Sequence, residues 1–236
     1  MLNLPHFRMM VVAALWSGLW AGLLLTTVQS IQVVPTLLQA EVYEERVTAH
    51  THFNNAATEP HQHEAEAWQP KNGWERTAYT AVANSSLAVG FALLLGAASN
   101  LRGGINHWRE GLLWGIAGYT IFFVAPSLGL PPEVPGTEAA DLKDRQIWWL
   151  MTVFDTAFAL WLIVFSKTKQ NKLLGAVLLV SPHLLGAPQP EVHSSAAPAE
   201  LAHTFIIATT LTNAVFWLVL GGLMGWFSSK QQASKI

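Results

Sequence analysis

The chain has 236 residues, of which 51% are hydrophobic and 12% are charged, and its formal net charge is −2. Soluble globular domains carry about 25% charged residues, so this composition is typical of an integral membrane protein. Cysteine is absent, which excludes disulfides, thiolate metal sites and thiol nucleophiles, and the small net charge gives no indication of nucleic-acid binding.

Six apolar runs predict an all-α integral membrane protein, because a helix needs about 20 apolar residues to cross the hydrocarbon. We expect one membrane domain, residues 1–236, with a bundle of about six transmembrane helices at about 9–29, 78–98, 111–128, 147–165, 173–186 and 201–227. The first run follows Arg8 as a signal peptide would, but no small-residue cleavage site follows it, so we expect it to be retained. The fifth run, Leu173–Leu185, is short, which leaves a five-span bundle as the alternative.

Basic residues predict the orientation, because they collect in cytoplasmic loops. With six spans and a cytoplasmic N-terminus, the inner side holds eight basic residues and the outer side five. Both termini are then cytoplasmic. If the fifth run did not cross, the basic loop Lys167–Lys172 and the basic tail would fall on opposite sides, so six crossings fit better.

Acidic residues and histidines are skewed in the opposite direction. In this topology thirteen of the fifteen acidic residues and seven of the nine histidines lie at or near the outer face. Acidic residues barely influence insertion, so topology does not explain this bias. An outer surface rich in carboxylate and imidazole would concentrate cations by its field and by ligation.

A polar stripe continues from the first run towards the outer side. Gln29, Gln32 and two further polar residues share one helical face, and Glu41 and Glu44 follow at its outer end. Polar groups in a membrane helix usually face protein or water rather than lipid. The glutamines are candidates for the outer half of a cation path, with interhelix hydrogen bonding as the equal alternative. The two glutamates are candidate metal ligands at the mouth.

The longest loop, about 47–75, is rich in histidine and glutamate. It contains the pairs His50–His52 and His61–His63, and in an extended chain both imidazoles of such a pair point the same way. Imidazole suits divalent transition metals, so we expect a weak metal site here, completed by nearby glutamates. The alternative is a mobile polar loop whose histidines have no fixed role.

Three candidates lie in or beside the later spans. Asp155 is the one carboxylate well inside a predicted span; cation coordination or proton coupling is one interpretation, and a neutral, hydrogen-bonded acid is the other. His183 follows Pro182, where a broken helix can free carbonyls for a cation. His203 opens the last run, where a lone histidine is more often structural.

An ordered set of segments covers nearly the whole chain: Gly22–Pro35, Ala40–Glu44, the His-rich loop, Gly73–Tyr79, Ala125–Gly136, Asp141–Trp149 and Pro182–Pro190. Together they resemble CbtA, a family of predicted cobalt transporter subunits. The resemblance implies a bacterial inner-membrane protein that takes up Co²⁺, with a small single-span, His-containing partner, CbtB. Family members are usually given five spans rather than six.

We therefore expect a permease or channel subunit for the uptake of divalent transition metals, most of all cobalt. A metal-sensing or scaffold membrane protein without conduction is the alternative. A membrane metalloenzyme is less favoured, because there is no His-Glu-x-x-His or Gly-x-Ser-x-Gly motif and the paired histidines lie in a loop. We expect no permanently bound cofactor and no catalytic residues. The expected metal residues are His50, His52, His61, His63, Glu41, Glu44, His183 and His203, and the expected ion path is Gln29, Gln32 and Asp155.

Overall fold

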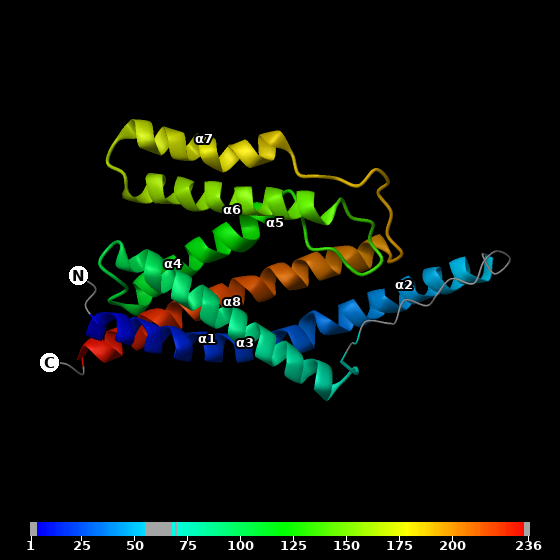
Figure 1. The fold of residues 1–236 in the computed structure, drawn as a ribbon, viewed down its shortest axis with the longest axis horizontal. Helices are drawn as coiled ribbons and strands as arrows, with labels where there is room; N and C mark the ends of the chain where they lie inside the picture. Colours follow the sequence, from blue (N-terminus) through cyan, green and yellow to red (C-terminus); the bar gives the residue numbers. More distant parts are fainter. Residues whose placement is uncertain (1–3, 55–67, 69, 234–236) are drawn as a thin grey trace.

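The computed structural model describes residues 4–54, 68 and 70–233, and helices dominate this part of the chain (Figure 1). In chain order they are α1 (Leu4–Gln32), α2 (Val34–Asn54), α3 (Trp74–Asn100), α4 (Trp108–Tyr119), the π-helical turn η1 (Thr120–Val124), α5 (Ala125–Ser127), α6 (Leu142–Phe165), α7 (Lys169–Leu185) and α8 (Ala199–Ala233). The predicted all-α architecture is confirmed for these residues.

Each of the six predicted apolar runs is helical. Four of the described helical stretches are long and apolar enough to cross a membrane by length and composition: Phe7–Gln32, Trp74–Asn100, Leu142–Phe165 and Ala199–Gln231. The other two runs differ in form, since α4, η1 and α5 follow one another directly over residues 108–127 and α7 has 17 residues. The chain is thus a multi-pass membrane protein with four clear spans, and six crossings stay a prediction.

The helices run back and forth between two ends of an elongated bundle (Figure 1). One end, called the terminal end here, holds the start of α1, the end of α8 and the connections 101–107 and 166–168. The opposite end, called the cap end, holds α2 and the connections 128–141 and 186–198. This alternation is the one that six crossings require.

Glycines bring the central helices into backbone contact. A Cβ added at Gly22 of α1 would lie 2.4 Å from Ser85 Cα of α3, and one added at Gly111 of α4 would lie 2.1 Å from the Gly221 carbonyl oxygen of α8. Small residues at such spacing let membrane helices approach closely, where packing replaces the hydrophobic effect as the driving force. The main core, with Trp217 at 2% exposure, lies among these helices.

Helices α6 and α7 form a peripheral pair. Gly175 of α7 sits against the Ala159 carbonyl of α6, where an added Cβ would approach to 2.8 Å. The pair meets the central helices mainly through η1 and α5, near the cap end. Trp148 of α6 is buried there and its Nε1 donates to the Pro182 carbonyl of α7 at 3.3 Å.

The cap end is built from α2 and two connections that are joined to each other. Thr137 and Ser195 form an antiparallel β-bridge, with the Ala196 N–H donating to the Gly136 carbonyl at 2.9 Å. Buried Val134 packs with Ala40 of α2 in a second, smaller core. The extended chain predicted from residue 47 onward is wrong for its first part, because α2 continues to Asn54 and projects past the rest of the bundle (Figure 1).

Candidate functional site

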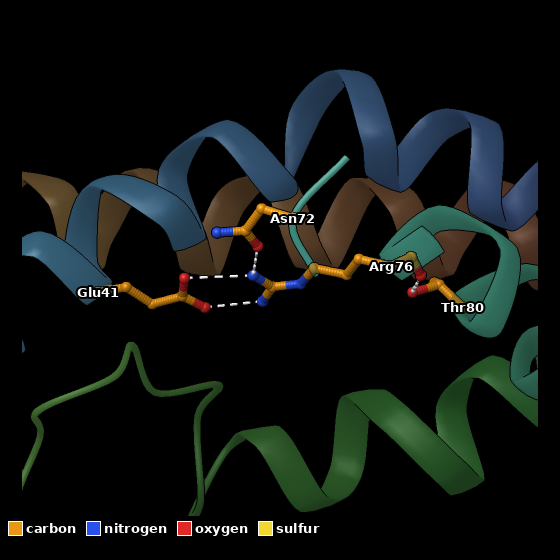
Figure 2. A network of polar contacts seen from close by, with 4 residues as sticks. All are labelled: Glu41, Asn72, Arg76 and Thr80. Atoms are coloured by element: carbon orange, nitrogen blue, oxygen red, sulfur yellow. Dashed lines mark hydrogen bonds and ion pairs between the residues drawn. The ribbon is translucent and has the colours of Figure 1, made fainter. Parts of the chain in front are cut away.

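Glu41 of α2 is held by Arg76 of α3 in the best-defined polar network of the cap end (Figure 2). Arg76 Nη2 donates to Glu41 Oε1 at 2.7 Å and Nη1 donates to Glu41 Oε2 at 3.2 Å. Nη1 also donates to Asn72 Oδ1 at 2.8 Å. A two-bonded guanidinium–carboxylate pair is geometrically specific and stronger than neutral hydrogen bonds. Glu41, a predicted metal ligand, is therefore already neutralised by an arginine.

Arg76 is not among the predicted site residues. Its only signal in the sequence is that it stands shortly before the apolar run that begins at Ala78. Nothing in the spacing between residues 41 and 76 tells which carboxylate it meets, since the two are joined by the long connection after α2. The pairing comes from the three-dimensional arrangement of the helices, which brings Glu41 of α2 within reach of Arg76 at the start of α3.

Glu44, one helical turn after Glu41, lies against the 128–141 connection of the cap. A Cβ added at Gly136 would lie 3.2 Å from Glu44 Cβ, and Gly136 has φ +75°. An L side chain rarely adopts this backbone conformation, so glycine is the residue that allows the connection to close over α2. Glu44 is exposed at this junction.

The paired histidines are only partly described. His50 and His52 fall in the last turns of α2, and their side chains lie outside the described part; His61 and His63 lie wholly outside it. Residues two apart on a helix do not share a face. The expectation that His50 and His52 turn to one side because the chain is extended is therefore wrong, whereas metal binding by this segment stays a prediction.

His183 and His203 are both near the cap end but in different surroundings. The His183 ring lies 6.0 Å from the Trp148 ring, edge to face, at the end of α7. His203 is exposed on the second turn of α8. No contact between the two histidines is found in the described structure, so each belongs to its own part of the cap.

Gln29 takes part in an interhelix hydrogen-bond network, as one of its two predicted interpretations requires. Asn84 Nδ2 of α3 donates to Gln29 Oε1 at 2.7 Å and to Thr26 Oγ1 at 3.0 Å. Gln32, one turn further along α1, is exposed. The network joins α1 to α3 and places several oxygen and nitrogen atoms in the half of the bundle nearer the cap end.

Asp155 lies elsewhere, between α6 and α7. Its Oδ2 lies 3.5 Å from Ser181 Oγ, whose single O–H can donate either to this carboxylate or to the Leu178 carbonyl, which is closer at 3.0 Å. That carbonyl lacks its usual helical donor, because Pro182, four residues on, has no N–H. Gln29 and Asp155 therefore do not line one continuous path, since Gln29 lies between α1 and α3 and Asp155 lies between α6 and α7.

The described side chains do not assemble a metal centre. Among them, no three histidines or carboxylates are grouped closely enough to hold a metal ion. A bundle that carried a resident metal in a fixed cage would bring such residues together. The candidate site is therefore a set of separate positions along the cap end and the adjacent half of the bundle.

The charges of the described chain are separated between the two ends. The acidic residues at the cap end are Glu41, Glu44, Glu45, Glu75, Glu133, Glu138, Asp141, Asp144, Glu191 and Glu200. The basic residues at the terminal end are Arg8, Arg102, Arg109, Lys167, Lys169, Lys172 and Lys230. Arg46, Lys71, Arg76, Lys143 and Arg145 partly offset the acids, and the cap end keeps a net negative charge that attracts cations.

Comparison with known proteins identifies a family. The family described as "Probable cobalt transporter subunit (CbtA)" matches residues 7–229. No curated protein and no solved structure matches the chain.

Proposed function

The chain belongs to the CbtA family of probable cobalt transporter subunits, and from this we propose that it forms a membrane path for the uptake of divalent transition-metal ions, with Co²⁺ as the cargo. Family membership supports a role in metal transport and, because the family is one of subunits, a partner. The path itself, the ion and a CbtB-like, His-containing single-span partner are our proposals.

The observation that carries the proposal is the separation of charge between the two ends. We propose that the protein spans a bacterial inner membrane, with the cap end facing outward and both termini in the cytoplasm. An inside-negative potential then favours inward movement by about 2.3 kcal/mol per charge per 100 mV. The acidic cap end would raise the local concentration of cations where they arrive.

We propose that the ion is passed along the cap rather than held by one cage. His50 stands nine positions after Glu41 in α2, a rise of about 14 Å along a helix. One ion cannot bridge that distance. His50, His52, His61 and His63 would capture the ion, and Glu44 and Glu41 would receive it, with His183 and His203 at the margin of the cap.

Below the cap, the network of Gln29, Thr26 and Asn84 would supply oxygen ligands to a partly dehydrated ion. Gln32 stands at its entrance. We place Asp155 beside this path rather than in it, as a carboxylate that could bind a second cation or a proton at the α6–α7 pair. We propose neither an enzymatic reaction nor a permanently bound cofactor.

The second candidate is a metal sensor or scaffold without conduction. It is favoured by one observation, that the side chains which the structure describes form no metal-holding group. A protein that only displays histidines on a projecting helix would need no connected path through the bundle.

Uptake of radioactive Co²⁺ by vesicles holding the full chain, with an imposed inside-negative potential, separates the two. We expect saturable uptake that grows with the potential. The double variant His50→Ala, His52→Ala should raise the half-saturating concentration about tenfold, equivalent to losing about 1.4 kcal/mol of binding, at unchanged maximal rate. His193→Ala is the matched control, a cap-end histidine whose ring nitrogen lies 3.4 Å from Gln189.

If the half-saturating Co²⁺ concentration were unchanged in the double variant, His50 and His52 of α2 would have no part in capturing the ion. The proposal of a permease would still stand. Metal binding without uptake, in vesicles and in intact cells alike, would instead establish the sensor or scaffold.

A further inference from the structure

A groove of about 500 Å³ opens between α4 and α6. It exists because the two helices are held by different neighbours. Helix α4 packs its glycines against α8, whereas α6 meets the central helices through η1 and α5. The helices therefore meet near the cap end and diverge towards the terminal end, as their ribbons show (Figure 1).

Most of the groove is apolar and open to the side. Leu113 and Ile116 line it from α4, and Leu160 and Val164 from α6. Leu113 is 67% and Val164 64% exposed, although both lie within apolar helices of a membrane protein. Such a wall faces hydrocarbon, and a groove of this volume is within the about 300–1,000 Å³ typical of ligand sites.

The mouth of the groove, at the terminal end, is charged. Arg102 lies there with its Cζ 4.2 Å from the Phe165 ring centroid and 5.6 Å from that of Trp161. Aromatic faces stabilise a cation but leave its hydrogen-bond donors unused. Neither of the two ion pairs found among the described side chains involves Arg102. A phosphate is one of the anions that a guanidinium binds with two parallel hydrogen bonds.

Glu110 gives the mouth a second, opposite charge. It lies in the first turn of α4 and lines the same groove. Its Oε2 accepts the Asn106 backbone N–H at 2.8 Å, which fixes the carboxylate at the mouth with acceptor capacity to spare, since a carboxylate offers about four lone pairs. A headgroup with negative charge alone would be repelled by it. A headgroup with a phosphate and a primary ammonium fits both residues.

We propose that this groove binds one phosphatidylethanolamine molecule from the leaflet at the terminal end. Its phosphate pairs with Arg102, its ammonium donates to Glu110, and an acyl chain covers Leu113, Ile116, Leu160 and Val164. Trp161 lies beside the headgroup, at the depth where indoles favour the membrane interface. The bound lipid fills the space that separates the α6–α7 pair from α4. This site is independent of the cobalt path, and its test does not use transport.

The test is lipid retention by the purified full chain, measured by native mass spectrometry after exchange into equal amounts of phosphatidylethanolamine, phosphatidylcholine and phosphatidylglycerol. We expect one retained phosphatidylethanolamine, favoured about tenfold over phosphatidylcholine, as one charge-assisted hydrogen bond would give. Phosphatidylcholine has the same phosphate but no N–H, so Glu110→Gln should abolish this preference. Arg102→Gln should weaken retention of all three lipids.

Leu113→Trp fills the groove from an exposed position and should expel the lipid without unfolding the protein. Lys169→Gln, a basic residue at the same end but outside the groove, is the control and should change nothing. Equal retention of the three lipids by the unaltered protein, a preference for phosphatidylglycerol, or full retention by Leu113→Trp would each overturn the proposal.

Discussion

Glu41 has two possible partners of opposite consequence: the arginine that holds it and the cation that it would receive. Both side chains of the Glu41–Arg76 pair are close to 30% exposed, so water screens the pair and its contribution to stability is small. Ion pairs of this kind contribute about 0.2–1 kcal/mol. A divalent ion arriving at the cap can therefore compete with Arg76 for the carboxylate, and the pair sets how easily Glu41 is released.

The first prediction follows from this competition. Arg76→Gln should tighten Co²⁺ binding to the full chain up to about fivefold, the equivalent of about 1 kcal/mol, because Glu41 becomes available without cost. Glu41→Gln should weaken binding and remove the effect of Arg76→Gln. Calorimetric titration with Co²⁺ measures both.

Arg145→Gln provides the matched control. Arg145 pairs with Glu133 at 3.0 Å, with side chains 30% and 29% exposed, and it also lies at the cap end. If both arginine variants tighten binding equally, the effect is one of overall charge and Glu41 has no special role.

The sequence identifies the residue types of this site but not their pairing. A gathering of acids at one end of the bundle is readable from the order of apolar runs, and the described helices show it at the cap end. The packing of the helices decides which of these residues meet. It pairs Glu41 with Arg76, and it places Gln29 and Asp155 on different helix pairs. Such contacts join residues far apart in the chain, and no local pattern encodes them.

At the scale of helices, the central bundle depends on glycines placed where backbones touch. Gly111 and Gly115 of α4 face Gly221 and Gly225 of α8. The approach is too close for any side chain at these points, so the packing of α4 on α8 tolerates no added atom. This close packing also fixes α4 away from α6.

Gly115→Ala should destabilise the protein by about 1–3 kcal/mol, the usual cost of forcing atoms into a packed interface. The added Cβ would lie 2.3 Å from the Trp217 carbonyl oxygen, and a backbone atom cannot move aside as a flexible side chain can. Thermal unfolding of the detergent-solubilised protein measures the loss.

Gly90→Ala is the control for that experiment. Gly90 lies within α3 and has no atom within 4 Å of an added Cβ. Alanine in a helix interior is favoured over glycine by about 0.5–1 kcal/mol, so this variant should be as stable as the parent or more so. A similar loss in both variants would show that the loss does not come from the contact of the added Cβ with the Trp217 carbonyl.

Helix existence is readable from the sequence far better than helix ends. All six apolar runs are helical, because about 20 apolar residues leave few alternatives in a membrane. The continuation of α2 to Asn54 could not be read from hydropathy, since its second half is polar. The π-helical turn at Thr120–Val124 could not be read from the sequence either, because its residues are as apolar as the run on both sides of it.

At the scale of the whole molecule, the two ends of the bundle are chemically different. Among the described residues, the cap end carries most of the carboxylates, and the terminal end carries most of the lysines and arginines. The orientation of this difference in the membrane decides whether the protein takes ions up, so topology is the measurement on which the proposed function depends.

Single cysteines can report it, because the natural chain has none. Glu191→Cys, at the cap end, should react with a membrane-impermeant thiol reagent in intact cells. Lys167→Cys and Lys230→Cys, both at the terminal end, should react only after permeabilisation. Labelling of Lys167→Cys and Lys230→Cys from opposite sides would establish the five-span alternative. If all three positions were labelled from the opposite sides to those expected, the cap end would face the cytoplasm, and the proposed direction of transport would be wrong.

The β-bridge between Thr137 and Ser195 has a mechanical consequence. It ties the segment entering α6 to the segment leaving α7, so the two helices are clamped at one end as a single hairpin. At the other end they are separated from α4 by the groove, where the Arg102 guanidinium makes a cation–π contact with the Phe165 ring of α6. We expect a hairpin restrained in this way to move least at its clamped end and most at its opposite end. In the proposed orientation that opposite end lies at the cytoplasmic face, so we expect any widening of the bundle to begin there and not at the cap.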